Sequence, residues 1–114
     1  RGKAPGAPNL PHRTCREVWR VAALSEDDVR RRLQDLPGWE LTPQGIRKTY
    51  RRRDFRDAIR LVNAVADLAE QANHHPDIEV AGYNRVTVTL MTHSERGVTE
   101  KDIALAWQIE QVAR

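Results

Sequence analysis

Three histidines carry most of the acid and base chemistry that this chain could perform near neutral pH. His74 and His75 are adjacent, and His93 follows later in the chain. An imidazole has an ordinary pKa of about 6.5, so it can donate or accept a proton without a large shift. Glu70 stands four residues before His74, and on a helix this spacing places its carboxylate beside that imidazole, where it can fix the tautomer of the ring. We therefore expect proton transfer at His74, His75 and His93, with Glu70 as a supporting acid.

Pro76 follows the histidine pair and restricts the backbone of His75 to an extended conformation. The rings of His74 and His75 should then diverge, so that they approach a flat ligand from different sides. Such an arrangement suits proton transfer at two atoms of one substrate. The alternative is that each histidine is simply a polar residue at the end of a helix or strand.

A metal site is the main competitor for the histidines. Two adjacent histidines do not readily present both rings to one ion from a regular element, and the chain has no HExxH-like pair of ligands. A single cysteine, Cys15, excludes an intrachain disulfide and a thiolate zinc site. We expect no metal, and a reducing cytoplasm as the compartment.

Charge and composition limit the partners. The chain has 114 residues and a net charge of +3, and its basic excess lies before Ser25. The arginine runs at 30–32 and 51–53 adjoin acidic residues, as expected of solvated surfaces. We therefore expect no direct nucleic-acid binding. No apolar run approaches the roughly 18 residues that a membrane span needs.

Hydrophobic periodicity predicts the elements that position the histidines. Ser25 and Asp28 resemble a helix cap, and Pro37-Gly38 ends that helix. Asp54 should cap the longest helix, which runs to about Asn73, and Thr99 with Asp102 should cap the last one. Alternating residues predict two hairpins, with strands at 39–42, 46–50, 78–80 and 83–92.

This order predicts an α+β fold, α-β-β-α-β-β-α, with a four-stranded antiparallel sheet and helices packed on one face. Residues 1–24, rich in Pro and Gly, are expected to form a flexible arm, and residues 25–114 a single domain. The other sheet face should show Thr87, Thr89 and Met91, which are neither charged nor strongly apolar. The open sheet edges and the apolar last helix around Trp107 favour a homodimer or homotetramer.

An ordered set of motifs in the sequence resembles one known family, the pterin-4a-carbinolamine dehydratases. The resemblance covers essentially Leu24 to Val112 and rests on these pieces: Glu70-Gln-Ala-Asn73-His74-His75-Pro76-Asp77, Tyr83-Asn84-Arg85-Val86, Thr92-His93 and Gly97-Val-Thr-Glu-Lys-Asp102-Ile-Ala-Leu-Ala, with Leu36-Pro37-Gly38-Trp39 and Asp54-Phe55 before them. The α-β-β-α-β-β-α order is also the fold of that family.

The resemblance implies dehydration of a 4a-hydroxytetrahydropterin to the quinonoid dihydropterin, a step that recycles the tetrahydrobiopterin cofactor of aromatic amino acid hydroxylases. It implies no metal and no organic cofactor. By position, the family's active-site histidines fall on His74, His75 and His93 and its supporting acid on Glu70. Its pterin contacts fall on eight residues: Asn73, His74, His75, Pro76, Met91, Thr92, His93 and Ser94. Vertebrate members also serve as dimerisation cofactors of a homeodomain transcription factor, a role that these motifs do not carry over.

Three positions depart from the common pattern of the family. Asn73 replaces a frequent Asp, Ile78 a frequent aromatic residue, and Met91 a usual Ser, which affects pterin affinity more than the reaction. We expect His75 and His93 to form the acid and base pair, in either order, with His74 orienting the substrate and Glu70 acting through His74. Thr92 and neighbouring backbone groups could hold the amide edge of the pterin.

Trp39 is either a core residue or a wall of the cleft, and the core is favoured. The alternative function is a non-enzymatic module that binds a protein partner, such as a transcription factor, through the last helix.

Overall fold

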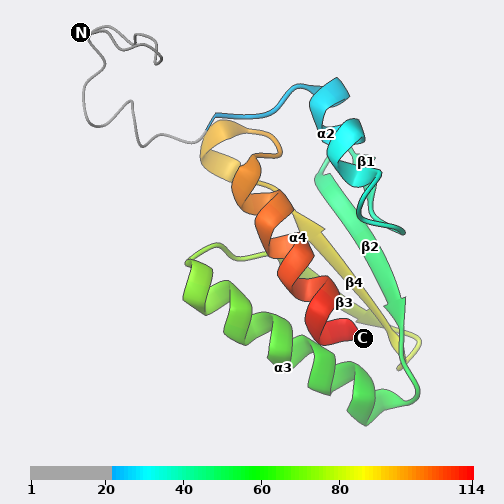
Figure 1. Ribbon diagram of the computed structural model, residues 1–114. Coiled ribbons are helices and arrows are strands. Elements are labelled where there is room, and N and C mark those ends of the chain that lie inside the picture. Colours follow the sequence, from blue (N-terminus) through cyan, green and yellow to red (C-terminus); the bar gives the residue numbers. More distant parts are fainter. Residues whose placement is uncertain (1–21) are drawn as a thin grey trace, which may run out of the picture.

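A computed structural model describes residues 22–114 of the chain (Figure 1). Most of the predicted arm, residues 1–21, lies outside the described residues. Leu24 belongs to the folded domain, because its backbone N–H donates to the carbonyl of Val98 at 2.7 Å and its side chain packs against the core. Among the described helices, none has the length and apolar character needed to cross a membrane.

The elements follow the predicted order, and they confirm the α+β class. Their bounds are α2 (Glu26–Leu33), β1 (Glu40–Thr42), β2 (Gly45–Arg51), α3 (Phe55–Ala72), β3 (Asp77–Ala81), β4 (Arg85–Leu90), the 3-10 turn η1 (His93–Glu95) and α4 (Glu100–Ala113). The expected caps are present: Ser25, Asp54 and Thr99 each accept a backbone N–H from the first turn of their helix. The last strand is shorter than the predicted 83–92 at both ends, because the turn before it runs through Asn84 and the strand ends at Leu90, ahead of η1.

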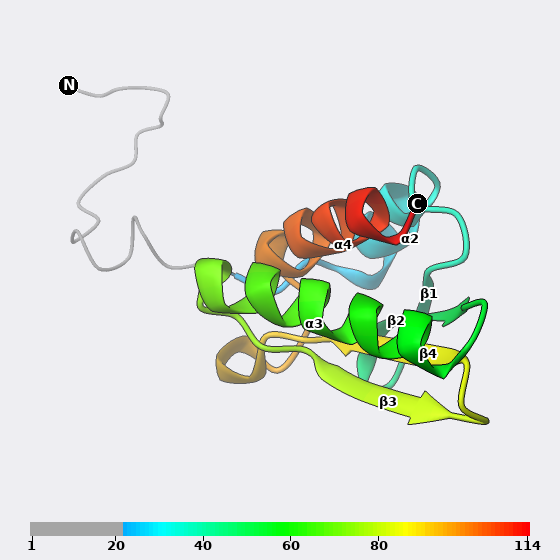
Figure 2. The same cartoon turned by 90° about the horizontal axis from the view of Figure 1, so that it is seen from below.

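The four strands form one antiparallel sheet in the order β1-β2-β4-β3, and the helices cover one of its faces (Figure 2). Val86, Val88 and Leu90 point to the helices and are fully buried, as their alternation predicted. Ile46 pairs with Leu90 and Tyr50 with Val86, so β2 presents its apolar side to the same core. Pairing within the sheet thus fixes both ends of β4. The chain that leaves β4 continues to Thr92 and His93.

The open face of the sheet is more polar than the sequence indicated. Thr87 lies there as predicted, and its hydroxyl is 2.8 Å from that of Thr49. Arg47 pairs with Thr89, and Glu79 pairs with Thr87, so charged side chains from β2 and β3 share this face. The sequence could not reveal these neighbours, because cross-strand partners depend on the register of strands far apart in the chain.

Trp39 is a core residue, with 5% of its surface exposed, and its ring meets that of Tyr50 edge to face at 6.4 Å. Glu110 of α4 binds both side chains through one carboxylate oxygen, which accepts from Trp39 Nε1 at 3.0 Å and from the Tyr50 hydroxyl at 2.5 Å. Lys48 Nζ donates to the same oxygen at 2.6 Å. Burial, together with the bond to Glu110, raises the pKa of Tyr50 well above its usual range. This cluster holds the C-terminal half of α4 on the sheet.

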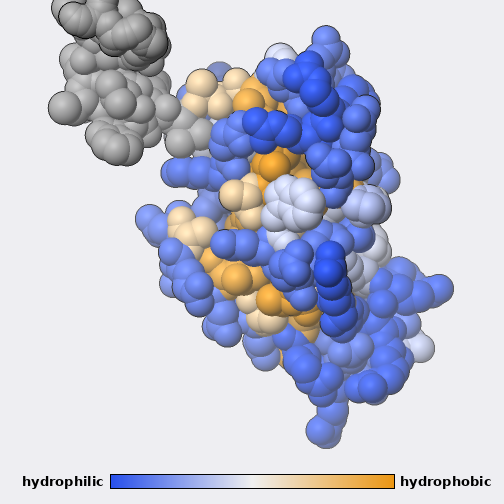
Figure 3. Space-filling view, viewed as in Figure 1, coloured by the Kyte–Doolittle hydropathy of each residue, from blue (hydrophilic) through white to orange (hydrophobic). Residues whose placement is uncertain are grey.

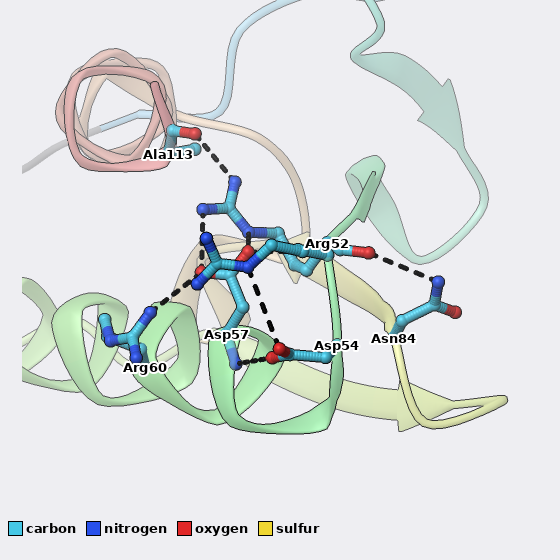
Figure 4. Close-up of polar contacts among 7 residues, drawn as sticks. Arg52, Asp54, Asp57, Arg60, Asn84 and Ala113 are labelled. Carbon is cyan, nitrogen blue, oxygen red and sulfur yellow. Dashed lines mark hydrogen bonds and ion pairs between the residues drawn. The ribbon is translucent and has the colours of Figure 1, made fainter.

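Arg52 joins several elements at the end of the molecule where α3 begins (Figure 4). Its Nη1 donates to the carbonyl of Ala113 at 2.7 Å, and its Nε lies 3.3 Å from Asp57 Oδ2. Asn84, in the turn between β3 and β4, donates to the Arg52 carbonyl at 3.2 Å. The junction fixes the start of α3 relative to α4, so the two helices are anchored at the end away from the histidines.

Candidate active site

The end of α3 determines how the histidine pair is presented. The helix stops at Ala72, and Asn73 adopts the left-handed conformation with φ 51° and ψ 42°. This conformation is common at helix C-termini because it turns the chain sharply, and Asn tolerates it better than most residues. The backbone N–H of His74 then bonds to the carbonyl of Ala69 at 3.0 Å. His74 is therefore already off the helix.

His74 turns inward to a residue of another helix. Its Nε2 lies 2.5 Å from Oδ1 of Asp102, in the first turn of α4. The imidazole is 11% exposed and the Asp102 carboxylate is completely buried. A buried carboxylate at this distance holds a proton on Nε2, which leaves Nδ1 as the ring nitrogen that can accept.

The predicted pairing of Glu70 with His74 is wrong. Glu70 Oε2 instead contacts His75 Nε2 at 2.8 Å, and both side chains are largely exposed. The prediction assumed that the helix continues through His74. Asn73 instead adopts the left-handed conformation, which breaks the i, i+4 relationship and brings His75 back to Glu70. Each adjacent histidine therefore has a carboxylate of its own, one buried and one in solvent.

Asp102 is the centre of a buried polar network. Its Oδ2 accepts from the backbone N–H of Thr99 and from the hydroxyl of Thr92, each at 2.9 Å. The Thr92 and Thr99 hydroxyls lie 2.7 Å apart. Asp102 thus caps α4 with one oxygen and binds His74 with the other, so the buried carboxylate is fully satisfied.

The sequence identified Asp102 only as a helix cap. A second signal was present: Asp102, Leu105, Ala106 and Ile109 occur at i, i+3, i+4 and i+7, and all four are buried. An acid at the head of an apolar stripe is costly to bury unless it has a partner inside the protein. That spacing indicates a buried partner for Asp102, although it does not identify His74.

His93 reaches the same rim from the other hairpin. Asp77 and Thr89 pair at the start of β3 and the end of β4, so the segment before β3 and the segment after β4 leave the sheet at one end. Figures 1 and 2 both place the end of α3, the turn η1 and the start of α4 together there. His93 is exposed, and neither of its ring nitrogens has a bonding partner within residues 22–114. The three predicted histidines therefore lie at one rim, where His74 and His75 contact carboxylates and His93 is exposed.

In the described part of the chain, no group of three or more His, Cys, Asp or Glu side chains could hold a metal ion.

Helices on one face of a four-stranded antiparallel sheet define a small α+β protein, and one end of its sheet carries a rim of histidines and carboxylates. The family model described as pterin 4 alpha carbinolamine dehydratase matches residues 22–112, and the chain belongs to this family of hydro-lyases. The match begins where the described structure begins and includes every residue of the rim.

The relatives are similar in sequence to this chain over nearly their whole length. A protein of Thermomicrobium roseum is 45% identical over 93 residues, which cover 82% of this chain and 99% of the relative. One of Aquifex aeolicus is 43% identical, covering 82% of this chain and 94% of the relative. Both carry the name "Putative pterin-4-alpha-carbinolamine dehydratase".

Two solved structures share the fold. A transcriptional coactivator/pterin dehydratase from Brucella melitensis is 37% identical with a TM-score of 0.76, and the match covers 81% of this chain and 99% of that one. A pterin dehydratase-like protein that is a RuBisCO assembly factor in the alpha-carboxysome is 22% identical with a TM-score of 0.54, over 66% of this chain and 86% of that one. The second likeness concerns the fold alone.

Proposed function

We propose that this protein dehydrates a 4a-hydroxytetrahydropterin to the quinonoid dihydropterin and so recycles a tetrahydrobiopterin-type cofactor. The observation that carries the proposal is the pair of contacts from His74 to Asp102 and from His75 to Glu70, at a rim that also holds His93. Membership of the dehydratase family supports the choice of substrate.

The reaction needs one proton delivered to the 4a-hydroxyl and one removed from the ring nitrogen side, so an acid and a base must both reach the substrate. His75 and His93 are exposed at the rim and can do so from different elements. We assign them as the acid and base pair. Glu70 supports His75, because it is the carboxylate in contact with that ring.

His74 acts as an orienting group in this proposal. Its ring is held by a buried carboxylate and cannot reorient without breaking the bond to Asp102. A fixed imidazole costs little to organise when the substrate binds, so it suits a hydrogen bond that positions the pterin.

The remaining substrate contacts come from the two segments that flank the rim. Asn73 and Pro76 precede β3, and Met91 and Ser94 follow β4. The hydroxyl of Thr92 is already bonded to Asp102 and Thr99, so we assign Thr92 a positioning role through that network. The proposed chemistry uses side chains alone, with no metal and no organic cofactor.

We also propose that the protein works as a homo-oligomer in the cytoplasm. Apolar surface is visible along the helical side of the molecule (Figure 3), and Trp107 of α4 is 43% exposed. Large exposed aromatic side chains of this kind favour association. Light scattering at micromolar concentration should give a mass above that of one chain, and Trp107→Glu should reduce it; a monomer would contradict the proposal.

A second candidate function, binding of a protein partner by α4, is favoured by the same exposed Trp107 and by the coactivator name of the Brucella melitensis relative. The two functions make different demands on the rim. Dehydration requires the histidines, whereas partner binding through α4 does not.

The test is a spectroscopic assay of carbinolamine dehydration with the purified full chain. His75→Ala and His93→Ala should each reduce kcat by about a hundredfold, the range expected for loss of a general acid or base. The double variant should be little worse than the poorer single one, because both groups act in one step. His74→Ala should raise KM more than it lowers kcat. Full activity in both single variants would refute the assignment, and no activity in the wild-type chain would favour the partner-binding function.

A further inference from the structure

A cavity of about 440 Å³ lies beside the histidine rim. It opens to solvent and is lined by the start of α2, the turn between β1 and β2, and the loop between η1 and α4. The histidines, Glu70 and Asp102 are all absent from its walls. Its volume falls within the range of roughly 300–1,000 Å³ that is common for small-molecule sites. Met91 is the lining residue that the proposed dehydration also uses, as a pterin contact.

The walls of the cavity combine apolar and polar groups. The apolar side chains that line it are Leu24, Val29, Leu41, Pro43, Met91 and Val98. Val29 and Val98 are buried, whereas Leu24, Leu41 and Met91 remain partly exposed. A ligand body without polar groups would gain by covering these three side chains.

Three charged side chains lie among the lining residues. Glu26 and Arg30 neutralise each other, with Arg30 Nη2 2.8 Å from Glu26 Oε2. Arg96 is different, because its guanidinium has no counter-ion or hydrogen-bond partner in the part of the chain that the structure describes. It follows η1 in the left-handed conformation, with φ 54°, next to Gly97 and Val98 of the cavity wall. The cavity thus combines a group of apolar side chains with one positive charge that has no partner among residues 22–114.

The loop that carries Arg96 is held firmly. Thr92 N–H donates to the Gly97 carbonyl at 2.9 Å, and Gly97 N–H donates back to the Thr92 carbonyl at 3.4 Å. Gly97 packs closely on the chain before α2, since a Cβ placed there would lie 3.2 Å from Ala23 Cβ. The wall beside Arg96 is therefore preformed, which reduces the cost of ordering it around a ligand.

We propose that this cavity is a second binding site, for a small molecule with an apolar body and one carboxylate. The apolar part covers Leu24, Leu41 and Met91, and the carboxylate pairs with Arg96. A guanidinium binds a planar carboxylate through two parallel N–H groups, so the geometry selects carboxylates over neutral ligands.

The test uses 3-phenylpropionate as the probe and its neutral amide as the matched control, each titrated into the ¹⁵N-labelled full chain and followed by amide NMR shifts. Binding should shift the amides of Val29, Leu41 and Val98, and the carboxylate should bind about fivefold more tightly than the amide. Arg96→Gln should abolish that preference, while Arg85→Gln, an exposed arginine at the far end of β4, should retain it. Both substitutions replace surface side chains and should leave the fold intact.

Three results would overturn the proposal. One is the absence of shifts at the cavity with millimolar probe. Another is equal affinity for the carboxylate and the amide in the wild-type chain. The third is binding that appears only after deletion of residues 1–21, which would mean that the cavity is filled by the chain itself. The titration involves no pterin, so its outcome is independent of whether the chain dehydrates one.

Discussion

Asp102 Oδ1 and His74 Nε2 are 2.5 Å apart, although the two residues are separated by 28 positions in sequence. The same carboxylate accepts the backbone N–H of Thr99 and so begins α4. The orientation of His74 is therefore coupled to the position of a helix N-terminus. A substitution at Asp102 should change the orientation of the His74 ring through Oδ1 and the capping of α4 through Oδ2. These two effects can be measured separately.

Asp102→Asn is expected to change the tautomer of His74. The amide of Asn can still accept from Thr99, but its NH₂ group would face His74 Nε2 and force the ring proton to Nδ1. Because Nδ1, the nitrogen that faces the substrate, would then carry the proton and could no longer accept one, kcat/KM should fall at least about tenfold. The ¹⁵N shifts of the His74 ring should report the exchange of the protonated nitrogen.

Thr99→Ala provides the control for that variant. It removes the capping hydroxyl, which should cost about 1 kcal/mol of stability, and leaves the His74 to Asp102 contact in place. Activity should therefore stay near the wild-type value at temperatures where the variant is folded. If Thr99→Ala lowered kcat/KM as much as Asp102→Asn, the effect of Asp102 would be structural.

Glu70→Gln should weaken proton transfer by His75. The contact between them is exposed to solvent, so its loss should lower kcat only about twofold to fivefold, with little change in KM. Adding Glu70→Gln to His75→Ala should cause no further loss, because the carboxylate then has no ring to act on. The exposed Asp67 of the same helix supplies the control, Asp67→Asn. A change in KM that resembles His74→Ala would contradict this pairing.

The histidines and Glu70 could be selected from the sequence, but their pairing could not. Selection rested on residue types at the ends of periodic segments, and those segments formed as helices and strands because the apolar spacing matches their geometry. Pairing depended on the backbone of Asn73, where one left-handed residue redirects both following side chains. Local rules of helix spacing fail at such a position.

The contact of His74 with Asp102 illustrates a second limit. It requires the end of α3 to meet the start of α4, and that meeting is set by packing of both helices on the sheet and by anchors at the far end, such as Arg52. None of these distances follows from periodicity. The α-β-β-α-β-β-α order was predictable because it needs only local patterns, whereas the network of His74, Asp102, Thr92 and Thr99 is a product of tertiary packing.

Glu110→Gln should destabilise the protein. Glu110 Oε2 accepts from Trp39, Lys48 and Tyr50, and these bonds hold the pKa of the carboxyl below its ordinary value although burial opposes them. A neutral amide leaves Lys48, 18% exposed, without its counter-ion, and the free energy of unfolding should fall by about 2 kcal/mol. Urea denaturation at pH 7 measures the loss. Glu79→Gln on the open sheet face should change stability by less than about 0.5 kcal/mol, and equal losses in the two variants would contradict a special role for Glu110.

Asp57 should make stability depend on pH in the acidic range. The backbone N–H of Arg53 donates to its carboxylate at 3.1 Å, and Arg52 adds a second hydrogen bond and a favourable charge, so the pKa of Asp57 lies below its ordinary value of 3.8 although burial opposes the shift. A carboxyl with a lowered pKa in the folded state stabilises the protein fully at pH values above the pKa of the unfolded chain. That contribution is lost as the pH falls through the folded pKa, because the unfolded state binds the proton first.

Asp57→Asn should therefore lower the free energy of unfolding at pH 7, and its difference from wild type should shrink when urea denaturation is repeated near pH 3. Asp67→Asn serves as the control, and dehydration by Asp57→Asn should be unchanged because Asp57 lies at the opposite end of α3 from the histidines. A difference between wild type and Asp57→Asn that is the same at both pH values would show that the side chain stabilises the junction without its charge.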